Sequence, residues 1–480
     1  MMSEYIEELQ KVLEPSKVLT EDFERFVYGA DWSPRTPEEI YPPDVVILPK
    51  TTEDVQKVVQ IAVKYKIPVT AGAGLTGMAG GAVPLYGGIY IDTTSMNDVI
   101  EIDVPNQTIR AQAGIPLQKL NEALEPHGLW LPNLPESKWS CTVGASIGCD
   151  NDSTFGMKYG KILNALLSAQ IVDGSARIIE LGHRKAHFTS TGYKLKDLLV
   201  GSEGTLGVIT EATLKVEPIP EHREIDMILF PSMKASVSFL SRLLQAGICP
   251  EGTHINCKRR LKFYTHAYRQ KYGKNPEVPD WAEALMALIF SGDHSVVKYH
   301  RDYAVKLAES YDGQVVKERE IVSGWWISKH TLEFEPFKQK WPDAQRVKKF
   351  GAADPGIPMG RLEEFYKEFI AIAEKHELEV LGMNAYLEHP FSIGFSLSCA
   401  LFVDYRNQDE VERFRKYFKE LTKKAVDYEG TMSTYMADTD LKVENFEYEH
   451  GKSTEYMVAI KKLFDPYGIM NPGKKFKRGE

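Results

Sequence analysis

Three short glycine-rich segments, each lying between apolar runs typical of strands, constrain this chain more than any other feature. Glycine lets the main chain approach a bulky ligand and leaves backbone N–H groups free to point at it. Three such segments predict one large, phosphate-bearing cofactor. The segments are A-G-A-G-L-T-G-M-A-G-G-A (71–82), C-T-V-G-A-S-I-G-C (141–149) and G-S-E-G-T-L-G-V-I-T (201–210).

The first segment does not have the context of a nicotinamide-binding site. It is followed by G-G-I-Y-I-D (87–92), which is typical of a strand, whereas the dinucleotide fingerprint leads into a helix. Upstream, residues 44–49 predict a strand. Thr51 or Thr52 is expected to cap the following helix, and a second strand begins at 67–69, which together make a β-α-β unit.

Size and charge limit the class of protein. A chain of 480 residues is too long for one core, so we expect two domains or more. Its 58 basic and 67 acidic residues give a net charge of −9, which argues against nucleic acid or an anionic membrane as a partner. The first residues lack the features of a signal peptide, and no apolar run approaches the roughly 20 residues of a membrane span. We expect a cytoplasmic enzyme.

The five cysteines form no C-x-x-C pair, so the sequence indicates neither an iron–sulfur cluster nor a structural zinc ion. If electrons leave through such a cluster, the cluster belongs to another chain. Free thiols in a reducing compartment are the simplest interpretation.

The glycine-rich segments, in this order, and F-D-P-Y-G-I-M-N-P-G-K (464–474) give the chain a family resemblance. It resembles the FAD-linked oxidases of the vanillyl-alcohol oxidase and p-cresol methylhydroxylase type, in the branch of D-lactate dehydrogenase and the glycolate oxidase flavin subunit. The resemblance implies an α+β fold. A two-subdomain FAD-binding domain (1–220) precedes an antiparallel-sheet cap domain with helices on one face (221–445), and a C-terminal segment (446–480) returns to the FAD domain.

The resemblance also implies which residues hold FAD. Four give N–H groups to the pyrophosphate, five line the flavin ring and ribityl chain, one meets the adenine, and one approaches the ring from the C-terminal tail. In that order they are Ala73, Gly74, Leu75 and Thr76; Pro135, Thr142, Gly144, Ser146 and Ile147; Ile209; and Asn471.

The positions of the histidines indicate whether the flavin is bound covalently. Relatives with a covalently bound flavin often carry a histidine in the first glycine-rich segment, and residues 71–82 contain none. Non-covalent FAD is therefore expected, although His389 and His450 leave attachment through a cap histidine open.

The metal site of the 2-hydroxy-acid branch has no clear counterpart. Those relatives carry G-H-x-G-D-x-N-L-H and a later G-E-H-G, whose histidines and carboxylate would bind a divalent ion. The corresponding stretch here, 381–398, offers only Glu388 and His389 as ligands. We expect no three-ligand metal site.

Four residues, with Tyr386 as a further alternative, are candidates for substrate binding and catalysis. Lys329 stands in W-I-S-K where relatives have arginine, and Lys349 is a second candidate for holding a carboxylate. His389 is the first choice of proton acceptor. Tyr435 and Tyr386 are alternatives, and Tyr435 lies where phenol-oxidising relatives carry a tyrosine. Surface roles for the lysines and packing roles for the tyrosines remain open.

The leading hypothesis is an FAD-dependent oxidoreductase that moves a hydride from a hydroxyl-bearing carbon to flavin N5, most simply from a 2-hydroxy acid such as D-lactate or glycolate. Metal-independent oxidation of a phenolic or benzylic alcohol is one alternative. A flavin electron-transfer subunit with an iron–sulfur or other acceptor protein is another, and a homodimer stays open. An ether-forming transferase is disfavoured because none of the 12 histidines neighbours another.

Overall fold

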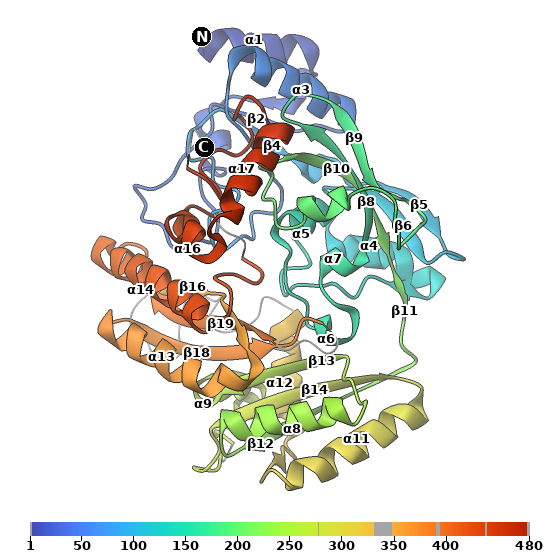
Figure 1. Ribbon diagram of the computed structural model, residues 1–480, viewed down its shortest axis with the longest axis vertical. Helices are drawn as coiled ribbons and strands as arrows, with labels where there is room; N and C mark the ends of the chain where they lie inside the picture. The colour runs from blue at the N-terminus through green and yellow to red at the C-terminus, as the bar shows by residue number, and fades with distance from the viewer. Residues whose placement is uncertain (1, 277, 331–347, 390–393, 437–438, 478–480) are drawn as a thin grey trace.

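The computed structural model shows two lobes, one built from the first 220 residues or so and one from most of the remainder (Figure 1). It describes residues 2–276, 278–330, 348–389, 394–436 and 439–477. Both ends of the chain lie at the N-terminal lobe, away from the lower sheet of the other lobe (Figure 1).

The first sheet of the N-terminal lobe confirms the expected β-α-β unit. Thr51 caps α3 (Thr52–Tyr65) through a bond from the Asp54 N–H to its hydroxyl. Strands β2 and β3 on either side of α3 both pair in parallel with β4, which lies between them. The sheet order is β1 (Val18–Leu19), β2 (Val45–Ile47), β4 (Ile89–Asp92), β3 (Val69–Gly72).

The second sheet of this lobe is antiparallel, and its first hairpin matches the two strands, joined by a Pro-Asn turn, that the sequence predicts at 98–104 and 107–113. The sequence predicts a strand over 163–172, but residues 163–165 are instead in α7 (Ile162–Ala165), where the Asn164 side chain accepts a hydrogen bond from the Lys161 N–H and starts a helical turn. The order is β5 (Val99–Asp103), β6 (Thr108–Gln112), β10 (Gly207–Lys215), β8 (Leu166–Asp173), β9 (Ile178–Gly182).

The second lobe contains one large antiparallel sheet, as the sequence predicts. Its order is β15 (Gln314–Val315), β12 (His222–Phe230), β14 (Ala284–Gly292), β13 (Gly252–Cys257), β18 (Glu379–Tyr386), β19 (Gly394–Val403), β16 (Lys349–Ala353), with β17 (Gly356–Pro358) also paired to β19.

Alternation along these strands separates two hydrophobic cores, because successive side chains point to opposite faces. Ile228 and Phe230 belong to the outer core with α8 (Met233–Gln245), α11 (His294–Glu309), α13 (Leu362–Lys375) and α14 (Gln408–Asp427). Met227 and Leu229 belong to the inner core. That core also takes α9 (Lys258–Tyr264) and α12 (Arg319–His330) and continues into the N-terminal lobe. The inner face is therefore the one that packs against the N-terminal lobe.

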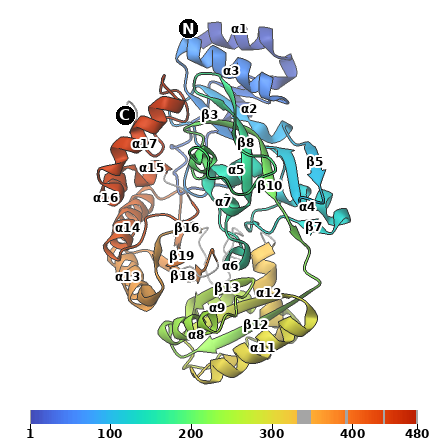
Figure 2. The same ribbon diagram turned by 45° about the vertical axis from the view of Figure 1, so that its right-hand side comes forward.

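The C-terminal segment lies alongside the N-terminal lobe (Figure 2). The Lys461 ammonium of α17 (Ser453–Phe464) donates to the carbonyl oxygens of Thr205, at 2.7 Å, and Met470, at 2.8 Å. Met470 forms a parallel bridge with Val69 of β3. These contacts hold the tail against the first and third glycine-rich segments.

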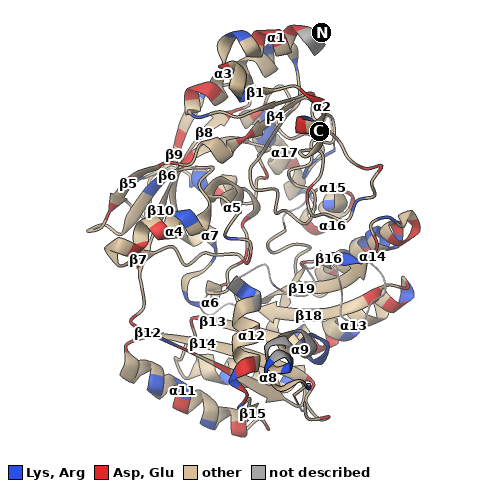
Figure 3. Ribbon diagram, turned by 180° about the vertical axis from the view of Figure 1, so that it is seen from behind, with Lys and Arg blue, Asp and Glu red and all other residues tan. Residues whose placement is uncertain are grey.

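The remaining elements connect and flank these sheets. In Figure 3, helices α11, α13 and α14 carry charges of both signs. Among the described residues, no helix is both long and apolar enough to cross a membrane. The connecting elements are α1 (Met2–Val12), α2 (Asp22–Phe26), α4 (Leu117–Leu124), β7 (Leu129–Trp130), α5 (Val143–Cys149), α6 (Gly156–Tyr159), β11 (Glu217–Pro218), α10 (His266–Tyr272), α15 (Thr439–Lys442) and α16 (Phe446–His450).

Candidate active site

A cavity of about 460 Å³ lies between the two lobes. From the N-terminal side it is lined mainly by residues of the segments 71–82, 135–152 and 203–209. From the other side it is lined by separate side chains: Arg260, Lys329, Phe350, Asn384, Tyr386, Ser398, Tyr435 and Met436.

Main-chain atoms form the cavity wall at the first glycine-rich segment, because there is no room for side chains behind it. A Cβ at Gly74 would overlap the Ser140 carbonyl oxygen, and one at Gly72 would overlap the Tyr90 hydroxyl. Leu75 has a φ of 52°, a left-handed conformation that turns the chain sharply. The segment thus presents its backbone to the cavity.

The second segment enters α5 close to the end of β6. Thr142 caps the helix, its hydroxyl accepting from the Ala145 N–H at 3.4 Å. The Gly144 N–H donates to the Ala113 carbonyl at 2.7 Å, and a Cβ on Gly144 would lie 2.8 Å from the Ala113 Cβ. Glycine is needed there for α5 to pack against the sheet.

Asn471 ties two cavity segments and strand β3 together from behind. Its side-chain amide donates to the carbonyl oxygens of Gly81, at 3.0 Å, and Glu203, at 2.6 Å. Its backbone N–H donates to the Val69 carbonyl at 2.7 Å. A buried amide with these partners fixes the relative position of the loops.

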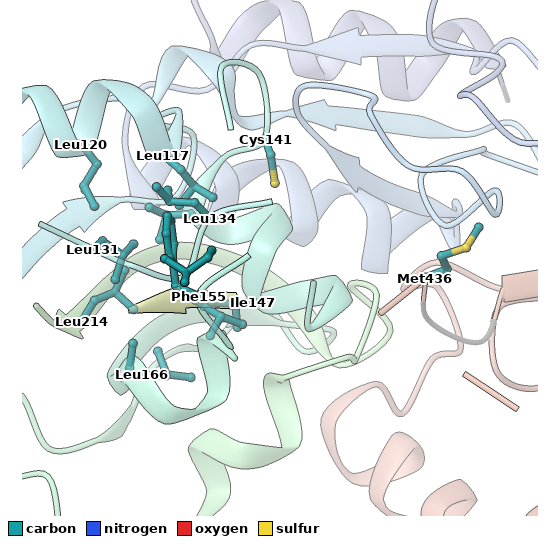
Figure 4. Close-up of a cluster of buried hydrophobic side chains, with 14 of the residues drawn as sticks. Leu117, Leu120, Leu131, Leu134, Cys141, Ile147, Phe155, Leu166, Leu214 and Met436 are labelled. Atoms are coloured by element: carbon teal, nitrogen blue, oxygen red, sulfur yellow. The ribbon is translucent and has the colours of Figure 1, made fainter. Parts of the chain in front are cut away.

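Most residues predicted to hold FAD are brought to this cavity. Those that line it are Ala73, Gly74, Leu75, Thr76, Pro135, Gly144 and Ile209. The other four, Thr142, Ser146, Ile147 and Asn471, are buried behind the lining. Ile147 packs among Leu117, Leu134 and Phe155 (Figure 4). These four therefore support the wall.

The two cysteines of the second segment, Cys141 and Cys149, line the cavity as free thiols. Burial raises the pKa of Cys141 to about 12 and raises that of Cys149 further. Both thiols are thus protonated and poor nucleophiles at neutral pH.

The arrangement fits FAD. Glycines at positions where a Cβ would be excluded leave backbone groups exposed along a cavity that runs from the β3 end of the N-terminal lobe to the cap. Backbone amides in such loops suit a pyrophosphate, and the apolar residues beside them suit a ring system.

The cap-side wall carries charged and phenolic side chains. Lys329 of α12 is only 5% exposed and forms an ion pair with Glu136. Arg260 of α9 is 3% exposed and donates to the Ser398 hydroxyl at 3.1 Å. Two buried cations beside one cavity are suited to an anionic substrate group, because a guanidinium and an ammonium can both donate to a carboxylate.

Tyr386 and Tyr435 form a hydrogen-bonded pair in the same wall, the Tyr386 hydroxyl donating at 3.2 Å. Burial is the main cause that raises the pKa of both phenols well above its ordinary value. At neutral pH both are therefore neutral, and they position a substrate oxygen by hydrogen bonding rather than by accepting its proton.

Asp152 is the carboxylate best suited to accept a proton here. It lines the cavity, and burial together with the negative charge of Glu136 raises its pKa to about 6, while Lys329 and Lys161 lower it. A base with a pKa just below neutral is ionised at pH 7 and still basic enough to take a proton.

Two of the four predicted catalytic residues lie elsewhere. Lys349 is exposed, with its ammonium 5.2 Å from the centre of the Tyr405 ring. His389 is exposed and lines a separate pocket of about 190 Å³. The other two, Lys329 and Tyr435, line the main cavity.

Sequence reasoning missed Arg260, Asp152 and Glu136. Arg260 stands in C-K-R-R and Asp152 in C-D-N-D, and neither pattern is distinctive. Glu136 directly follows Pro135, a predicted ring-lining residue, so its position was a usable signal. In the described part of the chain, no cluster of three His, Cys, Asp or Glu side chains is arranged to hold a metal ion.

A cavity walled by backbone loops and closed by an antiparallel cap defines a two-domain flavin oxidoreductase. Residues 43–182 match the model of an FAD binding domain, and residues 219–475 match that of the FAD linked oxidases, C-terminal domain. The chain belongs to the FAD-linked oxidase family, and it is an FAD-dependent oxidoreductase. These matches confirm the expected family, cofactor and α+β fold.

Curated relatives are similar over nearly the whole chain. Glycolate oxidase subunit GlcD of Bacillus subtilis is 27% identical, covering 98% of this chain and 96% of the relative. D-2-hydroxyglutarate dehydrogenase of Stutzerimonas stutzeri is 26% identical, covering 98% of each. D-lactate dehydrogenase of Archaeoglobus fulgidus is 26% identical, covering 90% and 91%.

Solved structures share the fold at lower identity. The 4-ethylphenol oxidase of Gulosibacter chungangensis superposes with a TM-score of 0.79 at 16% identity, covering 99% of this chain and 97% of that one. For p-cresol methylhydroxylase the TM-score is 0.77 at 16% identity, covering 100% and 97%.

Proposed function

We propose that this enzyme oxidises a 2-hydroxy acid to the 2-oxo acid. The observation that carries the proposal is the placement of two buried cations, Arg260 and Lys329, beside a cavity-lining carboxylate of raised pKa, Asp152. Relatives named for glycolate, D-lactate and D-2-hydroxyglutarate support the same substrate class.

In this proposal the residues divide the work. The Arg260 guanidinium and Lys329 ammonium bind the substrate carboxylate, and the Tyr386–Tyr435 pair orients the substrate hydroxyl. The Asp152 carboxylate accepts the hydroxyl proton. FAD, when bound, supplies the acceptor for the hydride and its electron pair. The residues proposed to hold it are the eleven of the sequence analysis, seven from the cavity lining and four from behind it.

Anaerobic reduction of the yellow protein tests the function. D-lactate, glycolate and D-2-hydroxyglutarate are added separately, and loss of flavin absorbance is followed. At least one hydroxy acid is expected to bleach the flavin, and its 2-oxo acid is expected in equal amount. If none does so over a wide concentration range while FAD remains bound, the substrate class is wrong.

A second candidate is a phenolic alcohol, which the hydrogen-bonded Tyr386–Tyr435 pair favours because two phenols can hold a third phenolic oxygen. Vanillyl alcohol, included in the same anaerobic screen, distinguishes a phenolic alcohol from a 2-hydroxy acid as the substrate. Bleaching by vanillyl alcohol but not by any hydroxy acid would select it.

We also propose that FAD is bound non-covalently. Among the described residues the cavity lining includes no histidine, and its thiols are held protonated. Acid denaturation is expected to leave the yellow colour in the supernatant; colour that stays with the precipitate would contradict this.

The domain limits, 1–220, 221–445 and 446–480, stay a proposal. They are supported by the position of β11 and β12 on either side of residue 220 and by the contacts of α17 with the N-terminal lobe. A protein electron acceptor is also proposed, because one relative is named as a subunit of an oxidase. A cytoplasmic location and a homodimer remain predictions from sequence.

A further inference from the structure

Residues 132–136 and 386–389 form a wall between the main cavity and the pocket that His389 lines. Two short stretches of chain line both spaces. Pro132 and Asn133 line the outer pocket, while Pro135 and Glu136 line the cavity. In the same way, Tyr386 lines the cavity and His389 lines the outer pocket. The second stretch thus crosses the wall within four residues.

Glu388 lies in this wall, on the stretch between Tyr386 and His389. It is 8% exposed, and one carboxyl oxygen, Oε2, accepts from the Ser153 N–H at 3.3 Å. The other oxygen, Oε1, is buried without a hydrogen-bond partner in the described part of the chain. Ser153 follows Asp152 directly, so Glu388 packs against the backbone that carries the cavity carboxylate. Burying a carboxyl oxygen without a hydrogen-bond partner costs free energy, so its presence calls for an explanation in terms of function.

The structure reserves space for this side chain. A Cβ on Gly156 would overlap Glu388 Oε2 and lie 3.1 Å from the Glu388 Cα. The Ser153 hydroxyl donates to the Pro132 carbonyl at 2.9 Å, which joins the two stretches of the wall.

The proposed reaction releases a proton inside the protein. Oxidation of the 2-hydroxy acid breaks one C–H and one O–H bond and forms the C=O bond. The hydride and its electron pair go to FAD, and the hydroxyl proton goes to Asp152, from which it must leave before the next turnover. We propose that Glu388 carries this proton through the wall, from Asp152 to the outer pocket beside His389.

The electrostatic interaction between Asp152 and Glu388 links the protonation of one carboxyl to that of the other. Burial, and then the negative charge of Asp152, raise the pKa of Glu388 to about 8, so Glu388 holds a proton in the resting enzyme at pH 7. Asp150 raises this pKa as well, while Lys161 and the Ser153 N–H lower it. When Asp152 takes the substrate proton, its charge disappears and the pKa of Glu388 falls. Glu388 then releases its proton outward and takes the one on Asp152, so one proton enters and one leaves.

Infrared titration of the substrate-free holoenzyme tests the coupling without turnover. The carbonyl band of a protonated, buried carboxyl is assigned to Glu388 by its loss in Glu388→Gln. The band is expected at pH 7 and should titrate near pH 8. In Asp152→Asn its midpoint should fall by about one unit or more. Absence of the band at pH 7 in the wild type, or a midpoint that Asp152→Asn does not move, overturns the proposal.

Proton release during one turnover tests the pathway itself. A pH indicator in weak buffer and the flavin absorbance are followed together after mixing with the hydroxy acid. In the wild type the proton is expected with the bleaching. In Glu388→Gln bleaching should occur once, with release slowed about tenfold or more. Glu364→Gln, a matched change at an exposed residue of α13 that lines neither space, should release the proton normally. Release that stays simultaneous in Glu388→Gln overturns the proposal.

Further outcomes are separable. If Glu388→Gln does not fold, Gly156→Ala, which crowds Oε2, replaces it both in the release assay and in the assignment of the infrared band, whose position it should change. The inference rests on the proposed function only for the source of the proton. Failure of every hydroxy acid to bleach the flavin, with the infrared shift intact, would reject the substrate and keep the coupled pair. Bleaching of the flavin without the infrared shift would keep the substrate class and reject the coupling of Asp152 and Glu388.

Discussion

The two walls of the cavity are built in different ways. The N-terminal wall consists of three contiguous loops, with glycines where a Cβ would collide with a neighbouring strand or loop, and it carries the carboxyl side chains of Glu136 and Asp152. The cap wall consists of separate side chains, such as Arg260, Lys329 and Tyr435, which come from distant elements. A cofactor shared by a family can be held by backbone geometry, whereas substrate recognition depends on individual side chains.

The comparison predicts that single side-chain changes at the substrate end will impair catalysis while flavin stays bound. Asp152→Asn removes the proposed proton acceptor and is expected to lower kcat/KM by about 10²–10⁴-fold. Reductive half-reaction rates and the flavin-to-protein absorbance ratio measure the two effects. Asp197→Asn, a matched change at the surface, should leave both unchanged.

His389→Asn sharpens this prediction, because the sequence favoured His389 as the proton acceptor. Since His389 lies outside the cavity, the loss of flavin reduction rate should be far smaller than for Asp152→Asn. A larger loss in His389→Asn would restore the hypothesis based on sequence.

Removal of a buried cation should weaken substrate binding. Arg260→Gln is expected to cost about 1.5–3 kcal/mol, the range for a hydrogen bond to a charged group, seen mainly in KM for the hydroxy acid. Lys349→Gln is the control, since Lys349 is exposed beside Tyr405. An equal rise in KM in both variants would show that Arg260 does not bind the substrate carboxylate.

A change in the backbone wall should act on the cofactor. Gly74→Ala places a Cβ against the Ser140 carbonyl, and displacing that loop is expected to cost about 1–3 kcal/mol in FAD affinity. Fluorescence titration of the apoprotein with FAD measures it. Gly360→Ala, where no atom lies within 4 Å of the added Cβ, is the matched control. Normal FAD affinity in Gly74→Ala would contradict a backbone-built site.

The smallest expected effect is a shift of the pH profile. Asp152 must be ionised to accept a proton, so kcat/KM should rise with pH, with a midpoint near pH 6, and then level off. Because the charge of Glu136 raises the pKa of Asp152, Glu136→Gln should move the rising limb to lower pH, by about one unit or less. A shift to higher pH would show that the charge of Glu136 does not raise the pKa of Asp152.

The sequence by itself determined the cofactor, the fold class and most of the elements. Glycine spacing and hydrophobic periodicity are local, so segments such as 71–82, and helices such as α4 and α14, could be identified from neighbouring residues alone. Residues 163–165 were misread because the side-chain bond of Asn164 that starts α7 competes with the strand pattern.

Only the tertiary structure decided which side chains line the cavity. Arg260, Asp152 and Lys329 are far apart in sequence, and only Lys329, through W-I-S-K, has a local pattern that distinguishes it from a surface charge. His389 has the chemistry of a catalytic base, yet it lies beyond the wall in which its neighbour Glu388 is buried. The physical reason is that burial and neighbouring charge, which set reactivity, depend on how distant elements pack.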